Sequence, residues 1–174
     1  MDTDGLSPME RGPEEALEKA GIGFIRLAHP EADTMEKCRG IGEEYGARHC
    51  KNLFLANKHG TNFFLLLMDP DKPYRTSEVS RKLGSTRLSF GTPEQLYAVL
   101  GLRPGSVSVM GLVNECARKA YDEGRLHIAI DGALLSRERI CVHPNTGEAT
   151  LVLATKDLIR FLESGGFEYA EVSI

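Results

Sequence analysis

Long apolar runs are missing from this sequence of 174 residues. The longest, residues 63–68, has six residues, whereas a helix needs roughly 20 apolar residues to cross a bilayer. The first five residues include two acids, Asp2 and Asp4, where a secretory signal would begin with basic residues and continue with an apolar stretch. We therefore expect no membrane partner and a cytoplasmic location.

Closely spaced cysteines are missing as well. The chain has four cysteines, none of them in a CxxC pair, and four scattered cysteines in a chain of this length do not form a disulfide framework. A zinc site would have to gather His49, Cys50, Cys141 and His143 across the fold without any local pair of ligands. We therefore expect reduced thiols with structural roles, and neither a metal ion nor another cofactor.

A large excess of one charge is also absent, since the formal net charge is −4. Residues 1–46 hold 11 acids and 5 bases, whereas residues 47–174 hold 14 acids and 16 bases. This balance argues against a dedicated, non-specific nucleic-acid binder, which shows a basic footprint. A local contact with RNA stays open at the densest basic stretch of the chain. That stretch either contacts phosphate groups or is only a solvated helix face. That stretch contains Lys72, Arg75, Arg81, Lys82 and Arg87.

Single glycines and prolines divide the chain into short periodic segments, as turns do, and no internal repeat is visible. The pattern predicts an acidic, mobile leader over residues 1–12 and a single domain over residues 13–174. Two apolar runs separated by a polar turn with a glycine predict a hairpin, and the unbroken second run predicts a strand covered on both faces. Helices and strands alternate, which predicts a mixed α/β fold with a mixed sheet. The predicted helices cover residues 13–20, 35–46, 76–83, 92–100 and 155–162, and the predicted strands cover residues 24–27, 51–56, 63–68, 87–90, 106–112, 126–130, 139–142, 148–153 and 167–174.

Standard catalytic signatures such as GxSxG, GxxxxGK[ST], HExxH and GxGxxG are absent, so the candidate site residues are isolated polar residues. Lys51, at the start of an apolar strand, can present its ammonium group to a cleft or be a solvated lysine. The turn at Gly105 can offer backbone N–H groups to a developing negative charge, or be a plain turn. His143 and His29 each precede a proline, and each can contact a substrate or serve the structure only.

Six short motifs follow one another between His29 and Gly166. They are His29-Pro30 with Thr34-Met35-Glu36, Lys51-Asn52-Leu53-Phe54-Leu55, residues 82–90, Gly105-Ser106-Val107-Ser108, Gly111-Leu112-Val113-Asn114 and His143-Pro144-Asn145-Thr146. Together they resemble the YbaK/ProX family of aminoacyl-tRNA deacylases, freestanding relatives of the editing domain that is inserted in bacterial prolyl-tRNA synthetases.

This resemblance implies a strongly curved mixed sheet or barrel-like core wrapped by helices, and a metal-free hydrolysis of the ester between an amino acid and the terminal ribose of a tRNA. Lys51 matches the family's essential lysine, which holds the terminal adenosine and the carbonyl group, and the loop at Gly105 supplies backbone donors. Asn52 orients the substrate and His143 lines the aminoacyl pocket. The resemblance also places Ser106, Thr34 and His29 among the substrate contacts.

The pair Lys51-Asn52 resembles the branch of the family that clears alanine from mischarged proline tRNA, whereas the cysteine-clearing branch has Lys-Thr there. The implied partners are the aminoacylated acceptor end of tRNA and, transiently, prolyl-tRNA synthetase. Val109 departs from the family, whose loop has proline at this fifth position, so the loop lacks the stiffness of proline. Two alternatives stay open: a Cys-tRNA(Pro) deacylase, and a non-catalytic module that binds tRNA or another ligand on the same fold.

Overall fold

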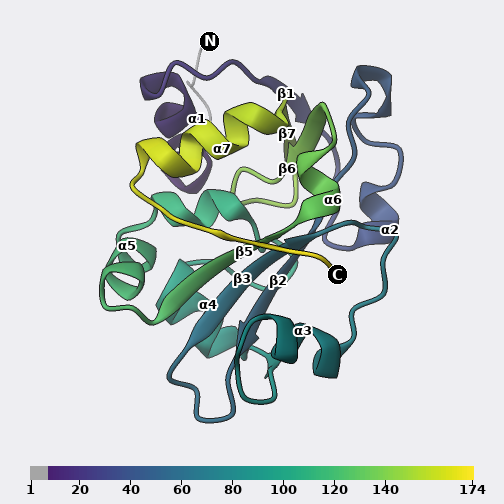
Figure 1. The fold of residues 1–174 in the computed structure, drawn as a ribbon. Helices are drawn as coiled ribbons and strands as arrows, with labels where there is room; N and C mark the ends of the chain where they lie inside the picture. The colour runs from purple at the N-terminus through teal and green to yellow at the C-terminus, as the bar shows by residue number, and fades with distance from the viewer. Residues whose placement is uncertain (1–7) are drawn as a thin grey trace.

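The computed structural model describes residues 8–174 (Figure 1), and its strands form two sheets. The smaller sheet has the order β1-β7-β6 and is antiparallel, and the larger has the order β4-β2-β3-β5-β8 and is mixed. The strands are β1 (Ile25–Ala28), β2 (Lys51–Ala56), β3 (Phe63–Met68), β4 (Ser89–Phe90), β5 (Leu126–Asp131), β6 (Arg139–Val142), β7 (Ala149–Ala154) and β8 (Ala170–Val172).

Helices cover both sheets, and short 3-10 helices occupy two of the connections. Figure 1 shows α1 and α7 beside the smaller sheet at one end of the molecule, and α3 against the larger sheet at the other end. The helices are α1 (Pro8–Lys19), α2 (Met35–Cys38), α3 (Thr76–Lys82), α4 (Pro93–Leu100), α5 (Glu115–Asp122), α6 (Gly132–Leu135) and α7 (Thr155–Ser164), and the 3-10 helices are η1 (Glu43–Tyr45) and η2 (Val109–Val113). The mixed α/β fold predicted from the sequence is therefore confirmed.

Strand β3 is the centre of the larger sheet, and all six of its residues are buried. Because successive side chains of a strand point to opposite faces, Phe63, Leu65 and Leu67 pack into the main core with α4, α5 and α7. Phe64, Leu66 and Met68 pack into a second core on the other face, with Val79 of α3. The predicted hairpin and the predicted coverage of residues 63–68 on both faces are confirmed, since β2 pairs antiparallel with β3 in the register Lys51 to Met68.

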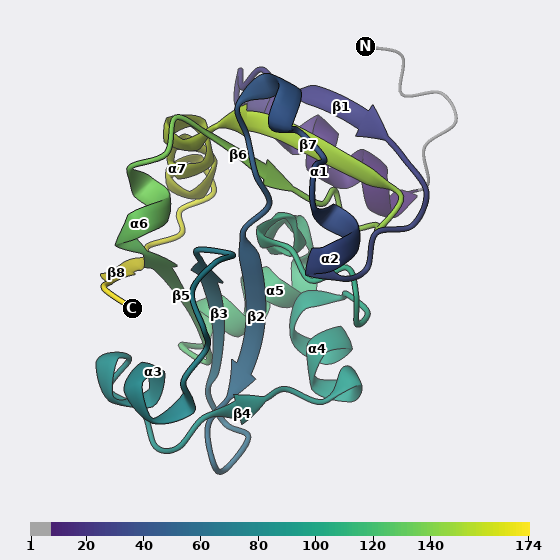
Figure 2. The ribbon, with the colours of Figure 1, turned by 90° about the vertical axis from the view of Figure 1, so that its right-hand side faces the viewer.

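Strand β2 begins close to where the two sheets meet. Just before it, His49 forms an isolated bridge with Cys141 of β6, and the backbone N–H of Cys141 donates to the carbonyl of Arg48 at 3.0 Å. Figure 2 shows the smaller sheet above the larger one, with α2 beside the beginning of β2. The first residues of β2 are therefore held between the two sheets.

Several predicted elements are corrected. The first helix begins at Pro8 instead of Pro13, so the predicted leader overlaps it, and residues 1–7 of that leader lie outside the described residues. The helix predicted after Thr34 ends at Cys38, with η1 following separately. Residues 106–112, predicted as extended, include the start of η2, because the Ser108 side chain accepts a hydrogen bond from the Met110 N–H at 3.1 Å and so begins a helical turn.

Two helices were not predicted. Helix α5 is largely polar, and only Ala117 and Ala120 are buried along it, so its apolar face is narrow. Helix α6 has four residues and begins after its N-cap Asp131, whose side chain accepts from the N–H of Ala133 at 3.2 Å. No helix within residues 8–174 is long and apolar enough to cross a membrane.

Candidate active site

A pocket of about 180 Å³ lies where the start of β2, the segment around α2, the Gly105 loop and the end of β6 come together. Five of the residues predicted from the sequence line it: Lys51, Asn52, Gly105, His143 and Thr34. The other lining residues are Asp33, Met35, Cys38, His49, Cys50, Leu53 and Val107. The structure thus brings together residues that are up to 110 positions apart in the sequence.

Lys51 is half-buried at the first position of β2. Its Nζ donates a hydrogen bond to the carbonyl oxygen of Lys72, in the loop that follows β3. An ammonium group has three N–H donors, so this bond fixes the side chain at the pocket wall and leaves two donors for a ligand.

Asn52 contributes an acceptor that lacks a donor. Its Nδ2 donates to the carbonyl oxygen of Cys50 at 3.3 Å and to the Cys50 Sγ at 3.4 Å. Its Oδ1 is buried and has no hydrogen-bond partner in the described part of the chain. Leaving a buried acceptor unpaired costs about 1–3 kcal/mol, so a ligand with an N–H or O–H donor would gain by pairing with it.

The Gly105 loop approaches the segment before α2 closely. Gly105 has a φ of +87°, and a Cβ on it would lie 2.8 Å from the Cβ of Asp33, so only glycine fits without a shift. Among residues 8–174, the backbone N–H groups of Gly105 and Val107 find no hydrogen-bond acceptor. Both residues line the pocket, so their N–H groups are candidate donors to a ligand.

Ser106 does not line the pocket. Its side chain and its backbone N–H both donate to the carbonyl oxygen of Arg103, at 3.0 and 3.1 Å. Its role is therefore to close the turn that carries Gly105 and Val107, rather than to offer a hydroxyl group to a ligand.

His143 is buried at the end of β6 and is tied to the Gly105 loop. Its carbonyl oxygen accepts from the Ser108 hydroxyl at 2.6 Å, and its Nδ1 lies 3.1 Å from the carbonyl oxygen of Ala149. Two residues on, Asn145 has a positive φ of 61° and donates to the carbonyl oxygen of Met110 at 3.4 Å. These bonds fix the His143 turn and the Gly105 loop to each other.

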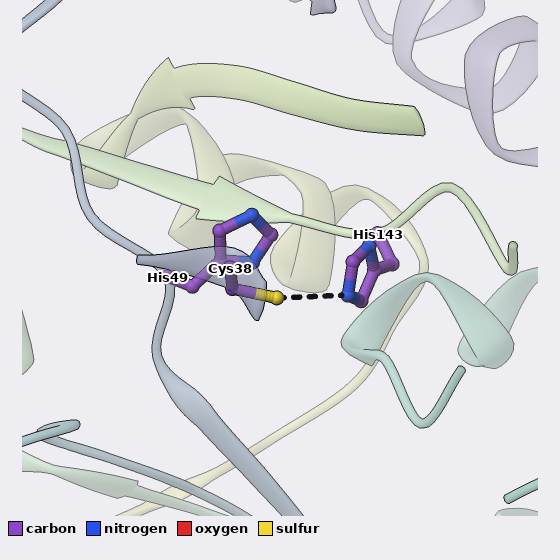
Figure 3. A group of neighbouring side chains, drawn as sticks. All are labelled: Cys38, His49 and His143. Atoms are coloured by element: carbon purple, nitrogen blue, oxygen red, sulfur yellow. Dashed lines mark hydrogen bonds between the residues drawn. The ribbon is translucent and has the colours of Figure 1, made fainter. Parts of the chain in front are cut away.

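Cys38, His49 and His143 form a compact buried group on this pocket (Figure 3). The Cys38 Sγ lies 3.6 Å from the His143 Nε2, and the two imidazole centroids are 4.8 Å apart. Burial lowers the pKa of His49 to about 3 and also lowers the pKa of His143, whereas burial raises the pKa of the Cys38 thiol. All three side chains are therefore uncharged near neutral pH, and this wall of the pocket is neutral.

Thr34 and His29 take part in the surrounding framework. Thr34 is the N-cap of α2, and its Oγ1 accepts from the N–H of Lys37 at 3.2 Å. His29 does not line the pocket, and its Nε2 lies 2.8 Å from the hydroxyl of Thr150, which also lies 3.0 Å from the His49 Nε2. His29 thus reaches the pocket only through Thr150 and His49.

The residues that the sequence analysis passed over are Cys38 and Asp33. Of the four residues for which a zinc site was set aside there, the described structure groups His49 and His143 with Cys38, and not with Cys50 or Cys141. Cys50 and Cys141 are buried free thiols, and burial raises the pKa of each to about 12. One signal in the sequence could have indicated Cys38 as a site residue: Cys38 follows Thr34 by four positions, and this spacing places both residues on one side of a helical turn.

Comparisons with known proteins give one consistent result. The family model of the aminoacyl-tRNA editing domain matches residues 29–161. The prolyl-tRNA editing protein ProX of Acetoanaerobium sticklandii is 28% identical over 158 residues, which cover 91% of this chain and 93% of that protein. The prolyl-tRNA synthetase associated domain-containing protein 1 of Danio rerio is 31% identical over 157 residues, covering 86% of this chain and 79% of that protein.

A solved structure of a candidate trans-editing enzyme for prolyl-tRNA synthetase has the same fold. It superimposes with a TM-score of 0.70 at 22% identity, over 98% of this chain and 99% of that one. The two-sheet fold described above is therefore shared with that protein.

Proposed function

Because this chain belongs to the aminoacyl-tRNA editing domain family, we propose that it is a trans-acting aminoacyl-tRNA deacylase, which hydrolyses the ester of mischarged proline tRNA. Two relatives support the substrate, since one is named a prolyl-tRNA editing protein and the other a protein with a prolyl-tRNA synthetase associated domain. The observation that carries the proposal is the meeting of the Lys51 ammonium, the unpaired Asn52 Oδ1 and two unused backbone N–H groups on one small pocket.

The backbone N–H groups of Gly105 and Val107 are proposed to stabilise the transition state. Attack on an ester carbonyl places negative charge on the carbonyl oxygen, and preorganised N–H donors that meet this charge typically lower the barrier by about 3–4 kcal/mol each. Gly105 allows the loop to approach Asp33 closely, and the bond from Ser108 to the His143 carbonyl prevents the loop from moving away. The two donors are thus fixed before the substrate arrives.

Lys51 and Asn52 are proposed to hold the substrate. The two free donors on the Lys51 ammonium bind the terminal adenosine and the ester carbonyl, and the ammonium charge adds to the stabilisation of the oxyanion. Asn52 Oδ1 accepts from the α-ammonium group of the amino acid, which supplies the donor that this buried oxygen lacks. Holding the ester in one orientation removes part of the entropic cost of the reaction.

The proposed nucleophile is water, and no metal ion takes part. Cys38 and Cys50 both line the pocket, but burial raises the pKa of each thiol and keeps it protonated, and a thiol is a poor nucleophile compared with the thiolate. An aminoacyl ester is already reactive, so an ordered water, the Lys51 charge and the two N–H donors suffice. The neighbouring ribose hydroxyl assists by orienting that water.

Alanine is proposed as the amino acid that is cleared. The neutral wall of Cys38, His49 and His143 suits a small apolar side chain, and the pocket of about 180 Å³ must also hold part of the ribose. A size difference of one methylene group changes binding by only about 1–3 kcal/mol, so a pocket that excludes proline by size discriminates against it only modestly. Action on free tRNA, with transient contact to prolyl-tRNA synthetase, completes the proposal.

The test is deacylation of alanyl-, cysteinyl- and prolyl-tRNA that carry the proline anticodon. We expect alanyl-tRNA to be hydrolysed fastest, and Lys51→Ala to slow this reaction at least 100-fold. Lys58→Ala is the matched control, because Lys58 lies exposed in the turn between β2 and β3 and does not line the pocket. Fastest loss of cysteine would establish the cysteine-clearing alternative, and no hydrolysis by the folded protein would establish a binding module.

A further inference from the structure

Cys38, His49 and His143 have a property that the proposed deacylation does not use. One ligand atom from each of them lies within 4.8 Å of the others, and the three residues are only 5%, 5% and 7% exposed. Thiolate sulfur and imidazole nitrogen are the ligands that zinc prefers in proteins. Whether they can bind an ion depends on which ring nitrogens carry hydrogen atoms.

A chain of hydrogen bonds determines this for His49. His29 Nδ1 lies 2.8 Å from the carbonyl oxygen of Pro30, so it must donate. In the tautomer with the hydrogen on Nδ1 alone, the Nε2 of His29 accepts from the Thr150 hydroxyl. With its hydrogen used in this way, Thr150 Oγ1 accepts from the Nε2 of His49. In this tautomer the Nδ1 of His49 has a free lone pair, and Figure 3 shows the inner ring nitrogen of His49 turned toward Cys38 and His143.

The same reasoning applies to His143. Its Nδ1 must donate to the carbonyl oxygen of Ala149, so its Nε2 has a free lone pair, and this lone pair faces the Cys38 Sγ. Histidines that bind metal ions characteristically donate their other ring N–H to an oxygen acceptor, which fixes the tautomer and the ring orientation. Both histidines of this group meet that condition.

We propose that Cys38, His49 and His143 form a zinc-binding site on the wall of the pocket. A tetrahedral ion with Zn–S of about 2.3 Å and Zn–N of about 2.0–2.1 Å places its sulfur and nitrogen ligands about 3.5–3.6 Å apart. The Cys38 Sγ and His143 Nε2 already lie at 3.6 Å. On binding, the thiol releases its proton to solvent and forms the Zn–S bond, both imidazoles give a lone pair, and a water molecule takes the fourth position.

Zinc at this site inhibits deacylation, and this consequence, unlike zinc binding itself, rests on the proposed function. With one thiolate and two neutral imidazoles, the occupied site carries a net charge of +1. Asn52 and Lys51 line the same pocket, so the new charge repels the α-ammonium group that Asn52 receives. The metal ion and its water also take up part of the small volume that the aminoacyl group needs.

The experiment is a titration of metal-free protein with Co²⁺, followed by displacement with Zn²⁺. A tetrahedral site with one thiolate gives visible cobalt bands and a thiolate-to-cobalt band in the near ultraviolet, at a stoichiometry of one. We expect Cys38→Ser to abolish the thiolate band and His49→Gln to weaken zinc binding at least tenfold. Cys116→Ser is the matched control, because Cys116 is a free cysteine outside the group, and it should bind both ions as the wild type does.

Thr150→Val tests the hydrogen-bond chain. Removing a partner that orients a metal ligand typically costs 10–100-fold in affinity, so this variant should bind zinc at least tenfold more weakly with Cys38, His49 and His143 all intact. Circular dichroism checks the fold of each variant. A further measurement uses the wild type alone: bound zinc should protect Cys38 from alkylation.

The proposal is overturned if folded wild type binds neither ion, or if Cys38→Ser binds cobalt with an unchanged spectrum. A protein that gives the cobalt spectrum but hydrolyses no aminoacyl-tRNA would retain the zinc site and refute the deacylase. A protein that hydrolyses alanyl-tRNA with zinc present in excess would refute inhibition by zinc.

Discussion

Replacing Gly105 with alanine should separate the geometry of the active-site loop from general stability. The residue has a φ of +87°, and the added Cβ would lie 2.8 Å from the Cβ of Asp33. A residue other than glycine at positive φ costs about 1–2 kcal/mol. Carbon atoms in contact lie about 3.5–4.0 Å apart, so the loop must also move by about 1 Å.

A displacement of about 1 Å at a catalytic loop lowers turnover on the order of 100-fold. We expect Gly105→Ala to lower kcat/KM for alanyl-tRNA by about this factor. Gly124→Ala is the matched control, because Gly124 has a similar φ of +71° but its added Cβ would meet nothing within 4 Å. Gly124→Ala should lose about 1–2 kcal/mol in urea unfolding and keep the activity of the wild type, whereas Gly105→Ala should lose at least as much stability.

Initial rates of deacylation and urea unfolding of the three proteins complete the comparison. If Gly105→Ala kept wild-type activity while losing stability, the backbone donors of this loop would have no role in the reaction. If Gly124→Ala lost as much activity as Gly105→Ala, the effect would be one of stability alone.

Three further predictions follow from single features of the structure. Acid should destabilise the protein, because His49 has a pKa of about 3 when folded and 6.5 when unfolded, so the unfolded chain binds the proton first. On account of His49, the free energy of unfolding in urea should be about 2.3 kcal/mol lower at pH 4.5 than at pH 6.5, a difference that His49→Gln should lack. Val109→Pro should keep both fold and activity, because proline suits the first residue of a helix and requires an extended residue before it. Val109 is the first residue of η2, and Ser108 before it is extended, with φ −152° and ψ 149°. A melting temperature lowered by more than a few degrees would contradict this. Replacing both Arg81 and Arg87 with alanine should weaken tRNA binding and reduce the slope of log affinity against log salt by about 2, and an unchanged slope would show that this basic stretch is only a solvated surface.

Local signals in the sequence predicted much of the fold. The hairpin of β2 and β3 follows from two apolar runs around a polar turn, and α4 follows from Thr92, Pro93 and Gly101, where the capping box and the left-handed cap occur. Lys51 and Asn52 could be singled out because they begin an apolar strand and match a family motif. Each of these features depends on residues that are close together in the sequence.

The parts that escaped prediction depend on distant contacts or on competing local signals. The alternating residues 106–109 are typical of a strand, but the Ser108 side chain caps a 3-10 turn instead. Cys38 joins the site only because its Sγ meets His143, 105 positions away. Neither the pocket volume nor the ring nitrogens that face it can be obtained from the spacing of residues, because both depend on how the two sheets are placed.

The pairing of β1 with β7 has a consequence for biosynthesis. Ile25 lies opposite Val152, and Ala28 lies opposite Ala149, so one of the first strands to leave the ribosome waits for one of the last before it can pair. Thr150, which orients His49, arrives with that late strand. A nascent chain therefore carries Lys51 and the Gly105 loop without a finished pocket until β7 has emerged, and the pocket is completed in a single late step.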